Sequence, residues 1–217
     1  MKRITTITAI TLACFCLLSC TQNKKQMLFN EKNLDNWFIL VSDPSVEAAD
    51  LFWVEDGVIT SSGVPHGYIR TLEKYSNFNL HVEWRWKDTP TNSGVLLHVQ
   101  GEDKVWPKAM ECQLASGKAG DIVLMREGTG ITIRDSTYLI RPGDSPYYVV
   151  PKNEESSEKA PGEWNSYDIT SQNGTLEAKV NGVLQNVGTD MTLHEGHILL
   201  QSEGSAIQFR NIWIEEL

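Results

Sequence analysis

The stretch NLHVEWRW, residues 79–86, alternates polar and apolar side chains with a period of two. One parity holds only large apolar residues, which are Leu80, Val82, Trp84 and Trp86. The other parity is polar and includes Glu83 and Arg85. This pattern is typical of a β-strand that buries one face and exposes the other. It predicts a β-fold with tryptophans in its core and a carboxylate beside a guanidinium on an open face.

Similar strand-like runs recur along the chain between turn signals. They cover residues 51–62, 67–75, 94–100, 109–115, 120–125, 131–135, 164–187, 196–203 and 206–217. Asn-Gly pairs in QNGT, residues 172–175, and VNGV, residues 180–183, are strong hairpin signals. Because no stretch carries a convincing helical stripe, the sequence predicts an all-β sandwich or barrel with little helix.

Two segments interrupt this rhythm. Residues 42–50, SDPSVEAAD, favour a loop or one short helical turn. Residues 141–163 are rich in proline, glycine and charge, and they form the longest irregular connection. Such a connection in a compact domain is often a binding loop, although its acidic middle is also consistent with solvated surface.

The N-terminus has the layout of a bacterial lipoprotein signal. A basic MKR precedes an apolar run, and LLSC places a small residue directly before Cys20. We expect a signal peptide over 1–19, lipid on Cys20, a tether over 20–27 and one domain over 28–217. The lipid would anchor the protein in the bacterial cell envelope, at the outer membrane, without a spanning helix. The alternative is an ordinary signal peptide in which Cys20 is incidental.

Charge and cysteine content limit the function classes. The formal net charge is −9, and loss of Lys2 and Arg3 with the signal would make it more negative, so nucleic acid is disfavoured as a partner. Cys112 is the only cysteine beyond Cys20, so no disulfide within the domain is expected. A nucleophilic role is open to Cys112, but its parity in MECQL favours a small buried hydrophobe.

Polar side chains follow the outward parity of other predicted strands as well. They are His98 in GVLLHVQ, Glu111 and Gln113 in MECQL, and Gln201 and Glu203 in HILLQSE. If these strands and residues 79–86 are neighbours in one sheet, their polar side chains line one groove. Carboxylates, amides and a guanidinium suit the directional hydroxyls of a sugar, and Trp106 at the rim would stack on its ring. The alternative is structural: Glu83 and Arg85 would form cross-strand ion pairs, and His98 would be a half-buried histidine.

A series of blocks resembles one known family. The blocks are LFNEKNLDNW, WVEDGVI, FNLHVEWRW, NSGVLLHVQG, VWPKAMECQLASGKAGDI, PGEWNSYDI, VNGV and GHILLQSEGSAIQFRNIWI, in that order. They resemble the domain of unknown function 1080 family, described as 3-keto-disaccharide hydrolases, and the match covers roughly residues 28–217. The resemblance implies a concanavalin A-like jelly-roll β-sandwich and a carbohydrate substrate.

The resemblance also implies a chemistry. A ketone at C3 acidifies the C2 proton, so a base can remove it, form an enediolate and expel the C1 substituent, after which water adds. We assign His98 and Glu111 as base and metal-ligand candidates for a divalent ion, Glu83 as a second acid or base, and Arg85 as the stabilising charge. Substrate hydroxyls would be held by Gln113, Gln201 and Glu203, with His66 on a glycine-rich loop within reach. A structural role is favoured for Arg210 and Asn211.

Two other functions remain open at this point. One is a noncatalytic carbohydrate-binding protein, because this fold is widely used for binding. The other is a hydrolase that uses two carboxylates on unoxidised glycans, although the E-x-D-x-E run of the laminarinase-like enzymes is absent from the sequence. The residues leave the oligomeric state open.

Overall fold

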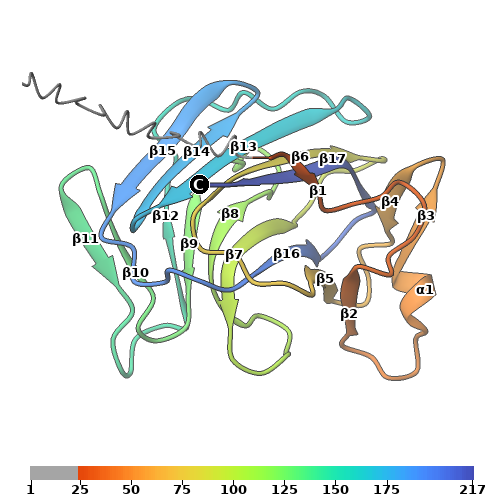
Figure 1. Ribbon diagram of the computed structural model, residues 1–217, viewed down its shortest axis with the longest axis horizontal. Helices are drawn as coiled ribbons and strands as arrows, with labels where there is room; N and C mark the ends of the chain where they lie inside the picture. Colours follow the sequence, from red (N-terminus) through yellow and green to blue (C-terminus); the bar gives the residue numbers. More distant parts are fainter. Residues whose placement is uncertain (1–23) are drawn as a thin grey trace, which may run out of the picture.

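The computed structural model describes residues 24–217, which form a sandwich of two antiparallel β-sheets (Figure 1). The expected signal peptide and the lipidated Cys20 lie outside the described residues. In Figure 1, strands β13–β15, β6 and β17 of one sheet cross above strands β7–β9 and β16 of the other. The predicted jelly-roll sandwich is confirmed.

The larger sheet, called sheet A, has ten strands in the order β11-β10-β15-β14-β13-β6-β17-β4-β3, with β1 paired to β17. Its strands are β1 (Gln26–Met27), β3 (Phe52–Glu55), β4 (Val58–Ser61), β6 (Phe78–Trp86), β10 (Gly130–Ile133), β11 (Ser136–Leu139), β13 (Asn165–Gln172), β14 (Thr175–Val180), β15 (Val183–Thr189) and β17 (Ile207–Glu216). Residues 26–27, expected in the tether, therefore belong to the sheet.

The smaller sheet, called sheet B, has seven strands in the order β12-β9-β8-β7-β16-β5-β2. Its strands are β2 (Trp37–Val41), β5 (Gly67–Thr71), β7 (Gly94–Gln100), β8 (Lys108–Gln113), β9 (Ile122–Met125), β12 (Tyr147–Val150) and β16 (His197–Ser202). The helix α1 (Ala48–Leu51) falls within the segment predicted as a loop or short helical turn. Strand β12 arises inside the segment expected to be irregular.

The main core lies between the two sheets. Leu80, Val82 and Trp84 of β6 are buried there, as the alternation in residues 79–86 predicts. Met110 and Cys112 of β8 reach the same core from sheet B. A second buried cluster, which includes Tyr68, Leu96 and Leu199, lies on the other side of sheet B. Sheet B is therefore covered on both faces along part of its length.

The two Asn-Gly pairs make the predicted hairpins. Asn173 and Gly174 join β13 to β14 with φ of 50° and 77°, and Asn181 and Gly182 join β14 to β15 with φ of 50° and 80°. Positive φ at both central residues is the backbone of a type I′ turn, whose twist matches that of the flanking strands.

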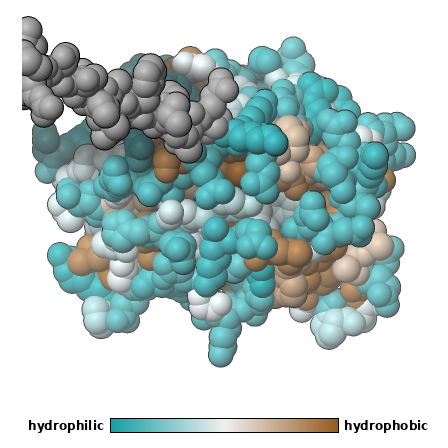
Figure 2. Space-filling view, in the orientation of Figure 1, coloured by the Kyte–Doolittle hydropathy of each residue, from teal (hydrophilic) through white to brown (hydrophobic). Residues whose placement is uncertain are grey.

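Figure 2 shows that the surface in this view is largely hydrophilic, with hydrophobic residues in separate patches. Among residues 24–217, no helix is long and apolar enough to cross a membrane.

Candidate functional site

A cavity of about 500 Å³ opens on the outer face of sheet B, and we call it the groove. Strands β8, β9, β12 and β16 and their connections supply its walls. The lining residues are Asn92, Trp106, Glu111, Gln113, Val123, Met125, Arg126, Pro146, Tyr147, Val149, Gln201 and Glu203. Five of the predicted site residues, Trp106, Glu111, Gln113, Gln201 and Glu203, thus lie together in one cavity, with a volume ordinary for a small-molecule site.

The register of sheet B sets the floor of the groove. Glu111 is paired with Leu96 of β7 on one side and with Val123 of β9 on the other. Two residues further along β8, Gln113 is paired with Gly94 of β7. Because side chains alternate along β8, Glu111 and Gln113 face outward while Cys112 faces the core. The outward parity predicted for β8 is therefore confirmed.

Gly94 gives the carboxyl group of Glu111 its place in the floor. A Cβ at position 94 would lie 2.3 Å from Oε1 and 2.8 Å from Cδ of Glu111, closer than nonbonded atoms approach. The missing side chain is therefore a steric requirement of this arrangement. It lets the carboxyl group lean from β8 over β7.

Glu111 is a buried carboxyl group without a cationic partner among the hydrogen bonds and ion pairs described. Burial, and then the negative charge of Glu203, raise the pKa of Glu111 from 4.5 to about 8. A carboxyl group with a pKa near the working pH exchanges a proton readily in either direction. This is the electrostatic state expected of a general acid or base.

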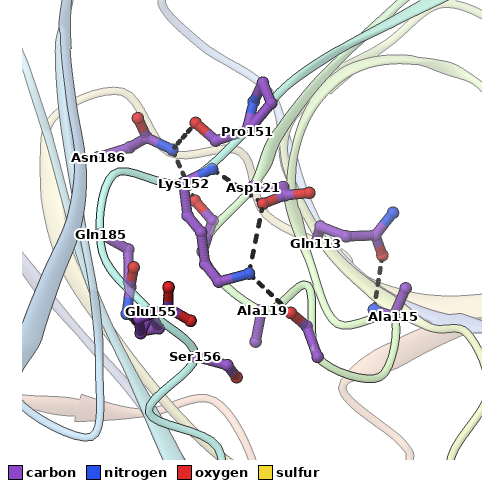
Figure 3. Close-up of polar contacts among 12 residues, drawn as sticks. Gln113, Ala115, Ala119, Asp121, Pro151, Lys152, Glu155, Ser156, Gln185 and Asn186 are labelled. Atoms are coloured by element: carbon purple, nitrogen blue, oxygen red, sulfur yellow. Dashed lines mark hydrogen bonds and ion pairs between the residues drawn. The ribbon is translucent and has the colours of Figure 1, made fainter.

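The amide of Gln113 is oriented by the chain that follows it. Its Oε1 accepts hydrogen bonds from the backbone N–H groups of Leu114 and Ala115, both at 2.8 Å. Figure 3 shows the second of these bonds, with the amide nitrogen on the far side of the side chain. Since two donors fix the oxygen, the NH₂ group remains as the donor toward a ligand.

Two buried acceptors in the groove have no partner among residues 24–217. They are Oε1 of Gln201 and Oδ1 of Asn92, and Gln201 is only 6% exposed. Buried polar atoms are nearly always hydrogen-bonded, by protein, water or ligand. Hydroxyl groups of a ligand would satisfy both acceptors.

The connection of residues 101–107 folds over the outer face of sheet B and carries Trp106 to the groove. Asp103 anchors it by accepting hydrogen bonds from Tyr68 at 2.8 Å and from Arg70 at 2.7 Å. The Trp106 indole N–H points to Glu203 Oε2 at 3.4 Å, and the Trp106 carbonyl accepts from Arg126 at 2.9 Å. Trp106, 37% exposed, therefore forms one rim of the groove as the sequence predicts.

His66 lies behind this rim. Its ring meets that of Trp106 edge-on at 5.1 Å between centroids. It lines a small hollow with Gln201 and Glu203 rather than the main cavity. His66 thus supports the tryptophan, and it reaches the groove only through that contact.

The prediction that Glu83 and Arg85 join this groove is wrong. Their strand β6 lies in sheet A between β13 and β17, so its outward face is on the opposite side of the sandwich. Glu83 accepts from Arg210 at 2.6 Å and from Asn211 at 2.9 Å. Burial acts to raise the pKa of Glu83, but these two hydrogen bonds and the charges of Arg210 and His81 together outweigh it and hold that pKa below its ordinary value.

Arg85 has structural partners on the same face. Its Nε donates to Gln208 at 2.8 Å, and its guanidinium lies over the ring of Trp164 at 4.6 Å. The sequence left open a structural role in which Glu83 forms an ion pair across neighbouring strands. The structure has this ion pair, with Arg210 as the partner. The structural role favoured for Arg210 and Asn211 is confirmed.

The outward placement predicted for His98 is also wrong. His98 has a φ of 52°, and the pairing of β7 with β8 shifts between Leu97 and Gln100. This bulge adds a residue and reverses the parity, so the ring turns into the core. There Nε2 lies 2.8 Å from Ser171 Oγ of β13, and burial lowers the pKa of His98 to about 4.

The expected metal pair does not fit this geometry. Glu111 faces the groove, whereas His98 faces the interior between the sheets, so the two cannot ligate one ion. Within residues 24–217 there is no group of three or more histidine, cysteine, aspartate or glutamate side chains placed to hold a metal. No chemical step is therefore derived through a metal here.

A network of polar contacts holds the chain beside the Gln113 end of the groove (Figure 3). The Lys152 backbone N–H donates to Asp121 at 2.9 Å, and the Lys152 ammonium donates to the carbonyl of Gly117 at 2.6 Å. Glu158 accepts from the N–H groups of Gly117 and Ala119. These contacts tie the irregular chain after β12 to the turn after β8 and so support the Gln113 backbone.

A family model for the 3-keto-alpha-glucoside-1,2-lyase-like domain matches residues 24–215. The chain belongs to this family. Its described domain is thus a member of a carbohydrate-active family, and the resemblance seen in the sequence blocks is confirmed. No curated protein sequence matches the chain significantly.

Solved structures of similar fold support the jelly-roll architecture of this family member. A protein from Parabacteroides distasonis described as a "putative glycosyl hydrolase" is 24% identical, with 89% of this chain and 94% of that chain covered and a TM-score of 0.63. The carbohydrate binding module CBM66 from Bacillus subtilis is 10% identical, with 85% and 98% covered and a TM-score of 0.57. The Bacillus licheniformis beta-glucanase is 11% identical, with 90% and 98% covered and a TM-score of 0.56.

Seven of the twelve lining residues were missed from the sequence, among them the polar residues Asn92 and Arg126 and the aromatic Tyr147. Asn92 and Arg126 lie just outside the strand-like runs, where parity gives no prediction. Tyr147 lies in the segment of residues 141–163, whose expected role as a binding loop was the only signal for it. A strand within that segment carries Tyr147 and Val149 to the groove.

Proposed function

We propose that this protein cleaves 3-keto-glycosides by removing the C2 proton and eliminating the C1 substituent. The observation that carries the proposal is Glu111, a buried carboxyl group with a pKa near 8 in the floor of a groove lined by sugar-compatible polar groups. The family supports the substrate class. A pKa near the working pH supports a residue that must take a proton from carbon and return it.

Glu111 is the base in this proposal. It takes the C2 proton, and the C2–H electron pair forms the enediolate across C2 and C3. Collapse of the enediolate forms the C1–C2 double bond and breaks the bond from C1 to the departing oxygen, which takes up a proton. Water then adds its oxygen to C1 and a proton returns to C2, so the net reaction is hydrolysis.

Other groove residues support these steps. Glu203 is the proposed acid for the departing oxygen, and it forms the rim contact with Trp106. The NH₂ group of Gln113 favours negative charge on the C3 oxygen, because a preorganised donor stabilises a developing oxyanion. Gln201 and Asn92 accept hydrogen bonds from sugar hydroxyls through their unpaired oxygens.

The test compares a glucoside with its 3-keto derivative, using wild type and Glu111→Gln. Wild type should cleave only the 3-keto glucoside. Deuterium at C2 of this substrate should slow cleavage if proton removal limits the rate. Glu111→Gln keeps the shape of the side chain but removes its basicity, so turnover should be lost. Dialysis against a chelator tests the sequence-based expectation of a divalent metal.

Two outcomes favour the alternative functions. Binding of both sugars without turnover would indicate a noncatalytic carbohydrate-binding protein. Cleavage of the unoxidised glucoside by wild type would indicate a hydrolase that uses two carboxylates, and it would contradict the elimination route.

A further inference from the structure

The groove has two chemically different halves. One half carries the polar residues Asn92, Gln113, Gln201 and Glu203. The other half is mainly apolar, with side chains from β9, β12 and the residue before β12, which are Val123, Met125, Pro146, Tyr147 and Val149. Arg126 lies at its edge, where its backbone N–H donates to the Pro146 carbonyl at 2.7 Å. A ligand that fills the whole groove must therefore be polar at one end and apolar at the other.

Glu111 lies at the boundary between the halves. Its register partner toward the apolar side is Val123, which is itself paired with Val149 of the edge strand β12. Toward the polar side its carboxyl group leans over Gly94, which is paired with Gln113. A sugar in the polar half would present C2 to Glu111. The departing oxygen on the neighbouring C1 would then lie at the boundary, on the side of Glu203, whose charge acts on Glu111, and the group that this oxygen carries would enter the apolar half.

The apolar half leaves two large side chains of β12 exposed inside the groove. Tyr147 is 60% exposed and Val149 is 41% exposed, on the edge strand of sheet B. Alternation along β12 places both on the groove side and Tyr148 on the other side, where its ring lies 5.2 Å from that of Tyr138. Exposed apolar surface gathered in a cavity is a feature of ligand sites.

We propose that this apolar half is a subsite for an aromatic leaving group, with its ring stacked on Tyr147. The substrates are then 3-keto-glycosides of aromatic or benzylic alcohols in preference to 3-keto-disaccharides. This inference rests on the proposed function. A second sugar would bring several hydroxyls to a wall whose side chains offer only the Tyr147 hydroxyl and the Arg126 guanidinium, which already donates to the Trp106 carbonyl. Unpaired polar groups weaken binding.

The experiment compares 3-keto-glucosides of benzyl alcohol and of ethanol with a 3-keto-disaccharide. Benzyl alcohol and ethanol have similar acidity, so a difference between their glucosides reports on binding of the ring rather than on ease of departure. We expect kcat/KM for the benzyl substrate to exceed the other two by about tenfold, the scale of burying and stacking one aromatic ring. Tyr147→Ser should reduce this preference to within about twofold.

Tyr148→Ser is the matched control, because it removes the neighbouring tyrosine from the opposite side of β12 and should leave all three kcat/KM values unchanged. Equal kcat/KM for the benzyl and ethyl substrates would overturn the subsite, as would a Tyr147→Ser variant that weakens all three equally. Calorimetric binding of the unoxidised benzyl and ethyl glucosides separates this inference from the proposed function. Suppose that no keto-sugar is cleaved, but wild type binds the benzyl glucoside more tightly than the ethyl glucoside and Tyr147→Ser loses this difference. The subsite then stands without the proposed function. Equal binding of the two glucosides by wild type contradicts the subsite.

Discussion

Gly94 and Glu111 form one structural unit, because the carboxyl group of Glu111 occupies the space that a side chain at position 94 would fill. A Cβ there would meet Oε1 at 2.3 Å and Cγ at 3.0 Å. The glycine thus determines where the proposed base lies.

The first prediction is that Gly94→Ala inactivates the protein with only modest loss of stability. The added methyl group must displace the Glu111 carboxyl group, and overpacking of this kind costs roughly 1–3 kcal/mol of unfolding free energy. A misplaced base should lower kcat/KM by about 100-fold or more. Denaturant unfolding and the 3-keto-glucoside assay measure the two effects.

The control for this variant is Gly182→Ala. Gly182 has a φ of 80° in the β14–β15 hairpin, with no atom within 4 Å of an added Cβ. The backbone strain should cost about 1 kcal/mol. Its kcat/KM should match wild type, and a similar loss of activity in both variants would mean that general destabilisation, not the Glu111 position, is responsible.

The second prediction concerns stability and pH. The pKa of Glu111 is raised in the folded protein from 4.5 to about 8, so the folded state holds a proton that the unfolded state releases. Wild type should therefore lose stability relative to Glu111→Gln as the pH rises from 4.5 to about 8. The difference should reach about 3 kcal/mol at pH 7, from about 1.4 kcal/mol per pH unit, and vanish near pH 4.

Denaturant unfolding of both proteins at pH 4, 7 and 8.5 measures this difference. A variant more stable than wild type yet inactive would show that the site keeps its carboxyl group at the expense of stability. Equal stability at every pH would mean that Glu111 is not buried in its ionised form.

The third prediction concerns the rate. If Glu111 removes the C2 proton, only its ionised form is active, so kcat/KM should rise with pH and level off above about pH 8, the pKa of this group. The spontaneous decay of the 3-keto-glucoside in base must be subtracted at each pH. A rate that falls over the same range would make Glu111 the acid and not the base.

The architecture could be predicted from the sequence because a strand half buried in a sandwich imposes a period of two. That period placed Leu80 and Trp84 in the core and Glu111 and Gln113 outside it. Parity does not state which sheet a strand joins, since the outer faces of both sheets look alike in sequence. Glu83 was therefore assigned to the wrong face of the molecule.

His98 and Gly94 show two further limits of the pattern. One added residue in the β7 bulge reverses the direction of every side chain counted through it, and no residue type near His98 announces the bulge. Gly94 matters through the side chain that it lacks, because the carboxyl group of Glu111 on the adjacent strand β8 occupies that space. Such relationships require the register, which the sequence alone does not supply.

The fourth prediction tests the corrected assignment of sheet A. Glu83→Gln and Arg85→Ala should keep kcat/KM within about twofold of wild type, because both side chains lie on the face opposite the groove and make structural contacts there. The loss of a partly exposed ion pair at Glu83 should cost at most about 1 kcal/mol. A large drop in kcat/KM with unchanged unfolding would return these residues to the active site.

The fifth prediction is that Cys112 is chemically quiet in the folded protein. Its thiol is fully buried in the core between the sheets, and burial followed by the nearby Glu111 raises its pKa well above the ordinary value. The reactive species is the thiolate, so a thiol reagent should label native protein only as fast as the core opens. Labelling should become rapid in denaturant. Cys112→Ala should keep the wild-type kcat/KM, and it should lose some stability because the missing sulfur leaves a cavity in the core. Rapid labelling of native protein, or a Cys112→Ala variant that is folded but inactive, would instead place a nucleophile within reach of the groove.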